Sequence, residues 1–269
     1  MNKMAIFLLL FAFSCGNKNN EDSYDSKELG DFSAYLDTKN LRLFAKEGVS
    51  DLFLNNVGKA YEAMLIDGIN INQSMRSHYL LITKDEYVYQ RVGVYSENNF
   101  NFDPGTPPKP FDDNVTDYIW EFKESTKDQI GEVLEHLLHT VTNVILNLAY
   151  PNEWDFNKSS SALSEAMQEA IDKGIYNINS YDELKNDKEI YHKILTQEYA
   201  YWLILAEWDY FIIADKKMEG MSGNEEFTIG TSSEISSQLP LGHKLYKDYI
   251  EKILCIPDSE TMLTLFPNK

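Results

Sequence analysis

The sequence feature that most constrains the fold is a helical repeat of apolar residues between residues 126 and 150. On a helix that turns by about 100° per residue, one arc of this segment is apolar and the opposite arc is polar. The apolar arc holds Ile130, Leu134, Leu137, Val141, Ile145 and Leu148, and the polar arc holds Glu132, His136, His139 and Asn143. We therefore expect a helix from Thr126 to Tyr150 that buries one side in the core.

The rest of the chain predicts an α+β fold that is predominantly helical. Helical spacing, capping residues and Gly68 predict further helices over Leu41–Asp67, Ser160–Lys173 and Lys188–Asp215, and a last helix or turn over Leu241–Leu254. Runs of β-branched and aromatic residues predict two adjacent strands, His78–Thr83 and Tyr87–Tyr95. Four prolines predict a long loop over Asn98–Asn114, and glycine and serine predict irregular structure over Met218–Leu239. We expect a small front sheet packed on the helix of residues 126–150.

Composition limits the number of domains and the kinds of partner. With 269 residues, 43% of them hydrophobic, the chain has enough apolar side chains for one sizeable core. We expect a single domain over 32–269, divided into 41–125 with the strands, 126–215 with the long helices and 216–269 at the C-terminal end. A net charge of −19 argues against nucleic acid as a partner, because that affinity needs clustered lysine and arginine.

The N-terminus has the pattern of a targeting segment. Lys3 precedes an apolar run, Ala5–Phe13, that is too short to span a bilayer and is typical of a secretion signal. The run ends in Ser14 and Cys15, and Ala12–Cys15 resembles the lipobox of bacterial lipoproteins, which implies lipidation of Cys15. We therefore expect a signal peptide over 1–14, a polar linker over 15–31 and an anchor in a membrane of the bacterial cell envelope. The alternatives are an ordinary signal peptide and a buried N-terminal strand.

The polar arc of the first helix is a candidate metal site. Glu132, His136 and His139 fall within roughly 60° on an ideal helix, and Glu135 lies at their edge. Histidine nitrogen and carboxylate oxygen both bind zinc at about 2.0 to 2.2 Å. The alternative is that this arc is simply the solvated face of the helix.

Glu198 is a second candidate ligand. It lies on an otherwise apolar stripe of the segment 188–215, together with Tyr191, Ile194, Trp202, Leu205 and Ile212. A carboxylate that faces a core is costly unless it is paired, protonated or bound to a metal. Glu198 is therefore expected to face inward and to bind a metal or to form a structural pair.

The segment Glu135–His139 resembles the His-Glu-x-x-His motif of the zincin superfamily of zinc peptidases, with its first two letters exchanged. In this frame Glu135 and His139 stand at the ligand positions and His136 stands where the general base belongs. A second frame, Glu132-x-x-Glu135-His136, resembles the inverted motif His-x-x-Glu-His and makes Glu135 the base. The resemblance implies a zincin-like fold, a zinc cofactor and a third ligand, Glu198, from a later helix. It also implies an edge strand that holds extended substrate, for which we nominate Tyr87–Tyr95.

Two functions follow from these patterns. The first is a membrane-anchored lipoprotein that binds zinc through His136, His139, Glu132 and Glu198 and hydrolyses peptides or proteins with Glu135 as the catalytic base. The second is a non-catalytic envelope lipoprotein that serves as a binding or assembly scaffold. Cys255, in the apolar segment Ile253–Ile256, is expected to be a buried structural thiol.

Overall fold

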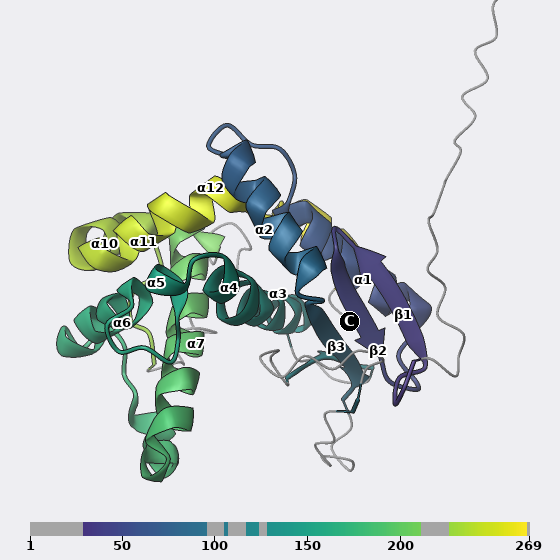
Figure 1. The fold of residues 1–269 in the computed structure, drawn as a ribbon, viewed down its shortest axis with the longest axis horizontal. Helices are drawn as coiled ribbons and strands as arrows, with labels where there is room; N and C mark the ends of the chain where they lie inside the picture. Colours follow the sequence, from purple (N-terminus) through teal and green to yellow (C-terminus); the bar gives the residue numbers. More distant parts are fainter. Residues whose placement is uncertain (1–28, 96–104, 107–116, 124–127, 211–225, 268–269) are drawn as a thin grey trace, which may run out of the picture.

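The computed structural model describes residues 29–95, 105–106, 117–123, 128–210 and 226–267 (Figure 1). The predicted signal peptide, Cys15, linker residues 15–28 and all but two residues of the proline-rich loop lie outside these ranges. Leu29, predicted to belong to the linker, is buried, and Asp31 exchanges hydrogen bonds with Thr106. The folded part of the chain therefore includes the last residues of the predicted linker. None of the helices within the described ranges combines the length and apolar character needed to cross a membrane.

A four-stranded mixed sheet lies at one end of the molecule (Figure 1). Strands β1 (Ala34–Thr38) and β2 (Leu41–Ala45) form an antiparallel hairpin. Their two-residue turn, Lys39–Asn40, has positive φ angles of 47° and 70°, as the twist of a tight hairpin favours. Strands β3 (Tyr89–Val94) and β4 (Tyr118–Glu121) continue the sheet in parallel, in the order β1-β2-β3-β4.

Two helices connect β2 to β3, and they correct two predictions. Helix α1 (Asp51–Met64) begins at its cap Ser50, so residues 41–45 of the predicted helix form β2 instead. Helix α2 (Gln73–Asp85) includes His78–Thr83, which we predicted to be a strand. Its buried residues, Arg76, Tyr79 and Thr83, are spaced as on a helix, and Asn72 caps its N-terminus. The β-branched and aromatic residues in 78–83 therefore predict the secondary structure of this segment less well than the spacing of its buried residues does.

The segment that carries the two histidines is helical as predicted. Helix α3 (Gln129–His139) starts at its cap Asp128 and continues through a π-helical turn (Thr140–Leu146) into α4 (Asn147–Ala149). The predicted apolar arc is buried along α3 and the π-turn. The wide turn begins directly after His139, and such π-turns are frequent at functional sites.

Most of the remaining helices form the other end of the molecule, whereas the last one, α13 (Ser259–Leu265), packs on α1 beside the sheet (Figure 1). In chain order they are α5 (Pro151–Trp154), α6 (Ala162–Asp172), a 3-10 helix (Asn179–Asn186), α7 (Lys188–Glu207), α10 (Ser232–Gln238), α11 (Pro240–Leu245), a π-helix (Tyr246–Ile250), α12 (Glu251–Ile253) and α13. The predicted helix at 160–173 is confirmed, and the segment 241–254, predicted as a helix or a turn, is helical. Helix α7 ends at Glu207, and residues 211–215 of the predicted helix lie outside the described residues. Residues 218–225 of the predicted irregular segment also lie outside them, and α10, capped by Thr231, replaces part of the rest.

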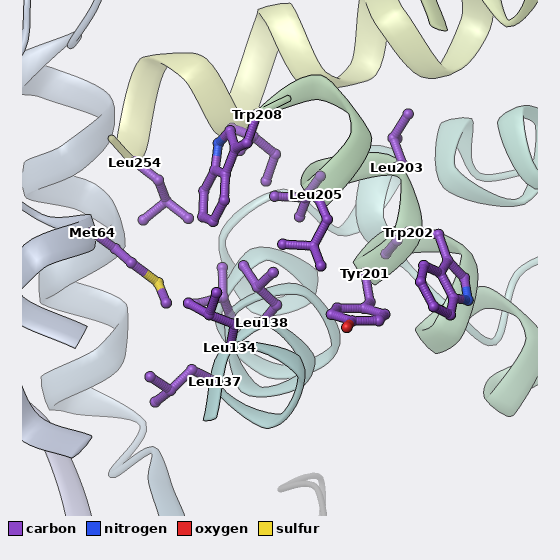
Figure 2. Packing of buried hydrophobic residues seen from close by; sticks show 14 of the residues in the cluster. Met64, Leu134, Leu137, Leu138, Tyr201, Trp202, Leu203, Leu205, Trp208 and Leu254 are labelled. Atoms are coloured by element: carbon purple, nitrogen blue, oxygen red, sulfur yellow. The ribbon is translucent and has the colours of Figure 1, made fainter. Parts of the chain in front are cut away.

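One continuous core joins the two ends. Figure 2 shows leucines of α3 between Met64 of α1 and the side chains Tyr201 and Leu205 of α7. All of these side chains are buried. The α+β class, with mostly helices and a small sheet, is therefore confirmed, and the packing of α3 against α7 fixes the relative position of their polar side chains.

Candidate metal centre

His139 and Glu198 meet where α3 packs against α7. The Nε2 atom of His139 lies 3.7 Å from Oε1 of Glu198, and the His139 side chain is only 2% exposed. Among the described residues, this Nε2 atom has no hydrogen-bond partner. Glu135, one turn before His139, completes a group in which one ligand atom from each residue lies within 4.8 Å of the others. The structure thus brings together two predicted ligands and Glu135.

The other nitrogen of His139 faces a carboxylate that the sequence analysis did not identify. Nδ1 lies 2.9 Å from Oδ2 of Asp117 and 3.1 Å from the amide nitrogen of Gln197. Burial alone would raise the pKa of Asp117, but the hydrogen bond and charge of His139 lower it to about 2. Burial alone would lower the pKa of His139, but Glu198 and Asp117 together raise it well above its ordinary value. The metal-free imidazole therefore behaves as a cation between two carboxylates.

His136 lies next to this group and has its own partner on the same helix. Its Nδ1 atom lies 2.9 Å from the backbone oxygen of Glu132, and its ring meets that of His139 edge to face at 5.5 Å between centroids. A ring nitrogen of His136 also lies within 4.8 Å of ligand atoms of Asp117 and His139. His139 consequently belongs to two overlapping groups, one with Glu135 and Glu198 and one with Asp117 and His136.

Glu132, a predicted ligand, lies in neither group. Its Oε1 accepts a hydrogen bond from the backbone nitrogen of Trp120 at 2.9 Å and lies 3.5 Å from Nδ1 of His136. Gln129, one turn earlier, accepts from the nitrogen of Phe122 and donates to the oxygen of Trp120. These two side chains of α3 therefore bond the outer edge of β4 as a neighbouring strand would.

Glu135 lies in a strongly acidic environment. Burial raises the pKa of its carboxyl, and the charges of Glu198 and Glu132 raise it further, while His139 and His136 act in the opposite direction. A divalent cation at this position would relieve the repulsion between the carboxylates and the cost of burying them. The group thus has the chemical character of a cation site.

The predicted substrate strand is wrong. We nominated Tyr87–Tyr95 as an edge strand, but β3 pairs with β2 on one side and with β4 on the other. Its backbone groups are bonded within the sheet and cannot hold an extended peptide. The pairing of β3 and β4 was missed because β4 has only four residues and follows the proline-rich segment.

The other histidines and the described cysteine belong to separate contacts. His78 lies 3.3 Å from the oxygen of Ala149, His192 lies 3.0 Å from the hydroxyl of Ser164, and His243 lies 2.7 Å from a carboxylate oxygen of Glu207. Cys255 is half-buried rather than buried, and its thiol donates to the oxygen of Ile66. Within the described residues, these three histidines do not join the group around His139.

Comparison of the chain with protein-family models, with curated proteins and with solved structures gave no match.

Proposed function

We propose that Glu135, His139 and Glu198 bind one divalent transition-metal ion, with zinc as the ion to test first. The observation that carries this proposal is the separation of 3.7 Å between Nε2 of His139 and Oε1 of Glu198. Two ligands at about 2.1 Å from a tetrahedral ion lie about 3.4 Å apart. The observed distance is close to that spacing and too long for a direct hydrogen bond.

The chemistry of the ligand set fits a transition metal. Imidazole binds zinc, iron and copper well, and carboxylates are good ligands for zinc and manganese. The contact between Asp117 and Nδ1 of His139 is different, because 2.9 Å is the length of a hydrogen bond. Asp117 therefore serves as the outer carboxylate that holds the imidazole, an arrangement common around metal-bound histidines.

We further propose that the site hydrolyses a peptide bond. A bound divalent ion supplies Lewis acidity, which stabilises negative charge that develops on a substrate carbonyl. Glu135 is a ligand in this account, so the proton-transfer role passes to His136, as in the first frame of the zincin resemblance. Glu132 supports that role, since its backbone oxygen and carboxylate both face Nδ1 of His136 and leave Nε2 to exchange a proton.

One observation favours the non-catalytic alternative, a binding or assembly scaffold. A zincin-like peptidase needs a strand edge for its substrate, and here the backbone of β4 at Trp120 is already bonded to Glu132 and Gln129. Metal binding without hydrolysis is the outcome that this alternative predicts.

Metal content measured on purified protein tests the binding proposal. Residues 16–269, dialysed against buffer with trace zinc, should retain about one ion per chain, and His139→Ala should retain none. Sub-stoichiometric zinc that is unchanged in His139→Ala contradicts the proposal. Hydrolysis of a mixed peptide library, compared with a chelated control, then separates the peptidase from the scaffold.

We also propose that the chain is lipidated at Cys15 and anchored in the bacterial cell envelope. The support is the short apolar run that ends at Ser14 and Cys15. Metabolic labelling with a radioactive fatty acid should label the wild-type protein and leave Cys15→Ser unlabelled. Equal labelling of the two, or none in the wild type, contradicts lipidation.

A further inference from the structure

A chain of polar side chains connects the π-turn after α3 to the imidazole of His139. Nδ2 of Asn143, in the π-turn, donates to Oε1 of Gln197 at 2.7 Å, while the hydroxyl of Thr142 donates to the backbone oxygen of Leu138 at 2.8 Å. Asn143 is buried, so this orientation is fixed away from solvent. Because its oxygen faces Asn143, the amide nitrogen of Gln197 must face Asp117 and His139.

The carboxylate of Asp117 restricts where the proton of a neutral His139 can lie, and the Gln197 amide nitrogen lies close to both groups. This nitrogen lies 3.5 Å from Oδ2 of Asp117 and 3.1 Å from Nδ1 of His139, and an amide nitrogen only donates hydrogen bonds. If Nδ1 lacked a proton, it would face Oδ2 of Asp117 at 2.9 Å as one acceptor against another. The stable arrangement has Nδ1–H and the Gln197 amide both donating to Asp117.

The position of this proton decides which of the two overlapping groups can bind a metal. With its proton on Nδ1, His139 has a lone pair only on Nε2, which is the buried nitrogen without a partner among the described residues. That nitrogen faces Glu198. The amide nitrogen of Gln197, 3.1 Å from Nδ1, also occupies space on the Nδ1 side of the imidazole.

We infer that Gln197, held by Asn143, is a positioning residue that keeps Asp117 on Nδ1 of His139 and so reserves Nε2 for the metal. This inference rests on the proposed metal site. It assigns the ion to the group of Glu135, His139 and Glu198. It excludes the group of Asp117, His136 and His139 as the metal site.

The first test is zinc titration of the full chain by calorimetry. Gln197→Met keeps the length of the side chain and removes its hydrogen bonds, and it should weaken zinc binding by about 10-fold, as loss of outer contacts does at metal sites. In an Asp117→Asn background the same substitution should have much less effect, because Gln197 acts through Asp117. The inference would be overturned if Gln197→Met left the zinc affinity unchanged. It would also be overturned if the effects of Gln197→Met and Asp117→Asn on the free energy of zinc binding simply added.

A matched variant controls for general destabilisation. Asn56→Leu also removes an amide, one that donates to the oxygen of Leu265 away from the site. It should leave zinc affinity within about 2-fold of the wild type. An equal loss in Asn56→Leu and Gln197→Met would show that the loss at Gln197 is not specific and would overturn the inference.

Nitrogen-15 NMR of histidine-labelled protein provides a readout that does not depend on affinity. In the zinc-loaded wild type, Nδ1 of His139 should carry the proton and Nε2 should be the coordinated nitrogen. If the wild type binds no zinc, the proposed function fails, and spectra of the metal-free protein at alkaline pH still test Gln197. An Nδ1–H tautomer that is lost in Gln197→Met supports the inference, and the same tautomer in both proteins overturns it.

Discussion

Nε2 of His139 lies 3.7 Å from Oε1 of Glu198, although the two residues belong to helices far apart in the chain. Burial of Leu134 and Leu138 on α3 and of Tyr201 and Leu205 on α7 holds the two helices together (Figure 2). Glu198 lies three positions before Tyr201 on α7, and His139 directly follows Leu138 on α3. Both residues are thereby placed at the interface between the two helices. The apolar packing of the core therefore sets the distance between the proposed ligands.

The ligand set predicts which substitutions remove metal. His139→Ala and Glu198→Gln should each weaken zinc binding by more than the roughly 10-fold to 100-fold cost of losing an outer contact. His136→Ala should retain about one ion per chain, because His136 is not a ligand in this account. Calorimetric titration of the three variants checks this, and a loss of zinc in His136→Ala comparable to that in His139→Ala would contradict the ligand assignment.

Glu132 is predicted to support the sheet and not to bind the ion. Glu132→Ala removes the acceptor for the backbone N–H of Trp120 and should lower the free energy of unfolding by about 1 kcal/mol. Glu132→Gln keeps an oxygen acceptor and should cost less. Urea unfolding measures both changes, and zinc affinity should stay within about 2-fold in each variant; a larger loss of affinity would restore Glu132 as a ligand.

The pair of Asp117 and His139 predicts a stability that depends on pH in the metal-free protein. The pKa of Asp117 falls from 3.8 to about 2 on folding, so its contribution is present above pH 3.8 and is lost as the pH falls toward 2. The pKa of His139 rises above 6.5, so its contribution is complete below pH 6.5 and is lost as the pH rises through the folded-state value.

The measurement for this pair compares the wild type with Asp117→Asn in the presence of a chelator. Between about pH 4 and pH 6.5 the variant should be less stable by about 2 kcal/mol, from a shift of somewhat under two pKa units. The difference should shrink toward pH 2. A difference that is constant from pH 2 to pH 6.5 would show that the ion pair is not its source.

Arg76 is predicted to be a structural cation. It is 5% exposed, and its guanidinium donates to the backbone oxygens of Leu65, Ile66 and Ile253, which joins α1 and α2 to the end of α12. Arg76→Met should lower the free energy of unfolding by about 3 kcal/mol, because the three oxygens lose a charged donor. Lys59→Met, at an exposed position of α1, is the control and should change it by less than about 0.5 kcal/mol. Similar unfolding midpoints for the two variants would contradict this role.

The parts of the fold that were predicted correctly depend on short-range sequence patterns. The apolar arc from Ile130 to Ile145 repeats at the helical period, and the same spacing places Glu135 and His139 one turn apart. Glu198 was identifiable because it interrupts an apolar stripe. In each case the information lies within one helix.

The parts that were missed depend on contacts between distant segments. Asp117 approaches His139 only because β4 pairs with β3 and packs beside α3, and nothing in the sequence around Asp117 indicates that pairing. The predicted strand at His78–Thr83 failed because its composition favours strands while burial of Tyr79 and Thr83 on one face favours a helix. Gln197 acquires its role from Asn143 on another helix, a contact that the sequence does not reveal.

The most direct test of the metal centre is anomalous diffraction at the zinc absorption edge from crystals of the protein grown with zinc. The account predicts a single strong peak about 2.1 Å from Nε2 of His139 and bound also by the carboxylates of Glu135 and Glu198. A peak between Asp117 and His136, or no peak near His139 at all, would contradict it.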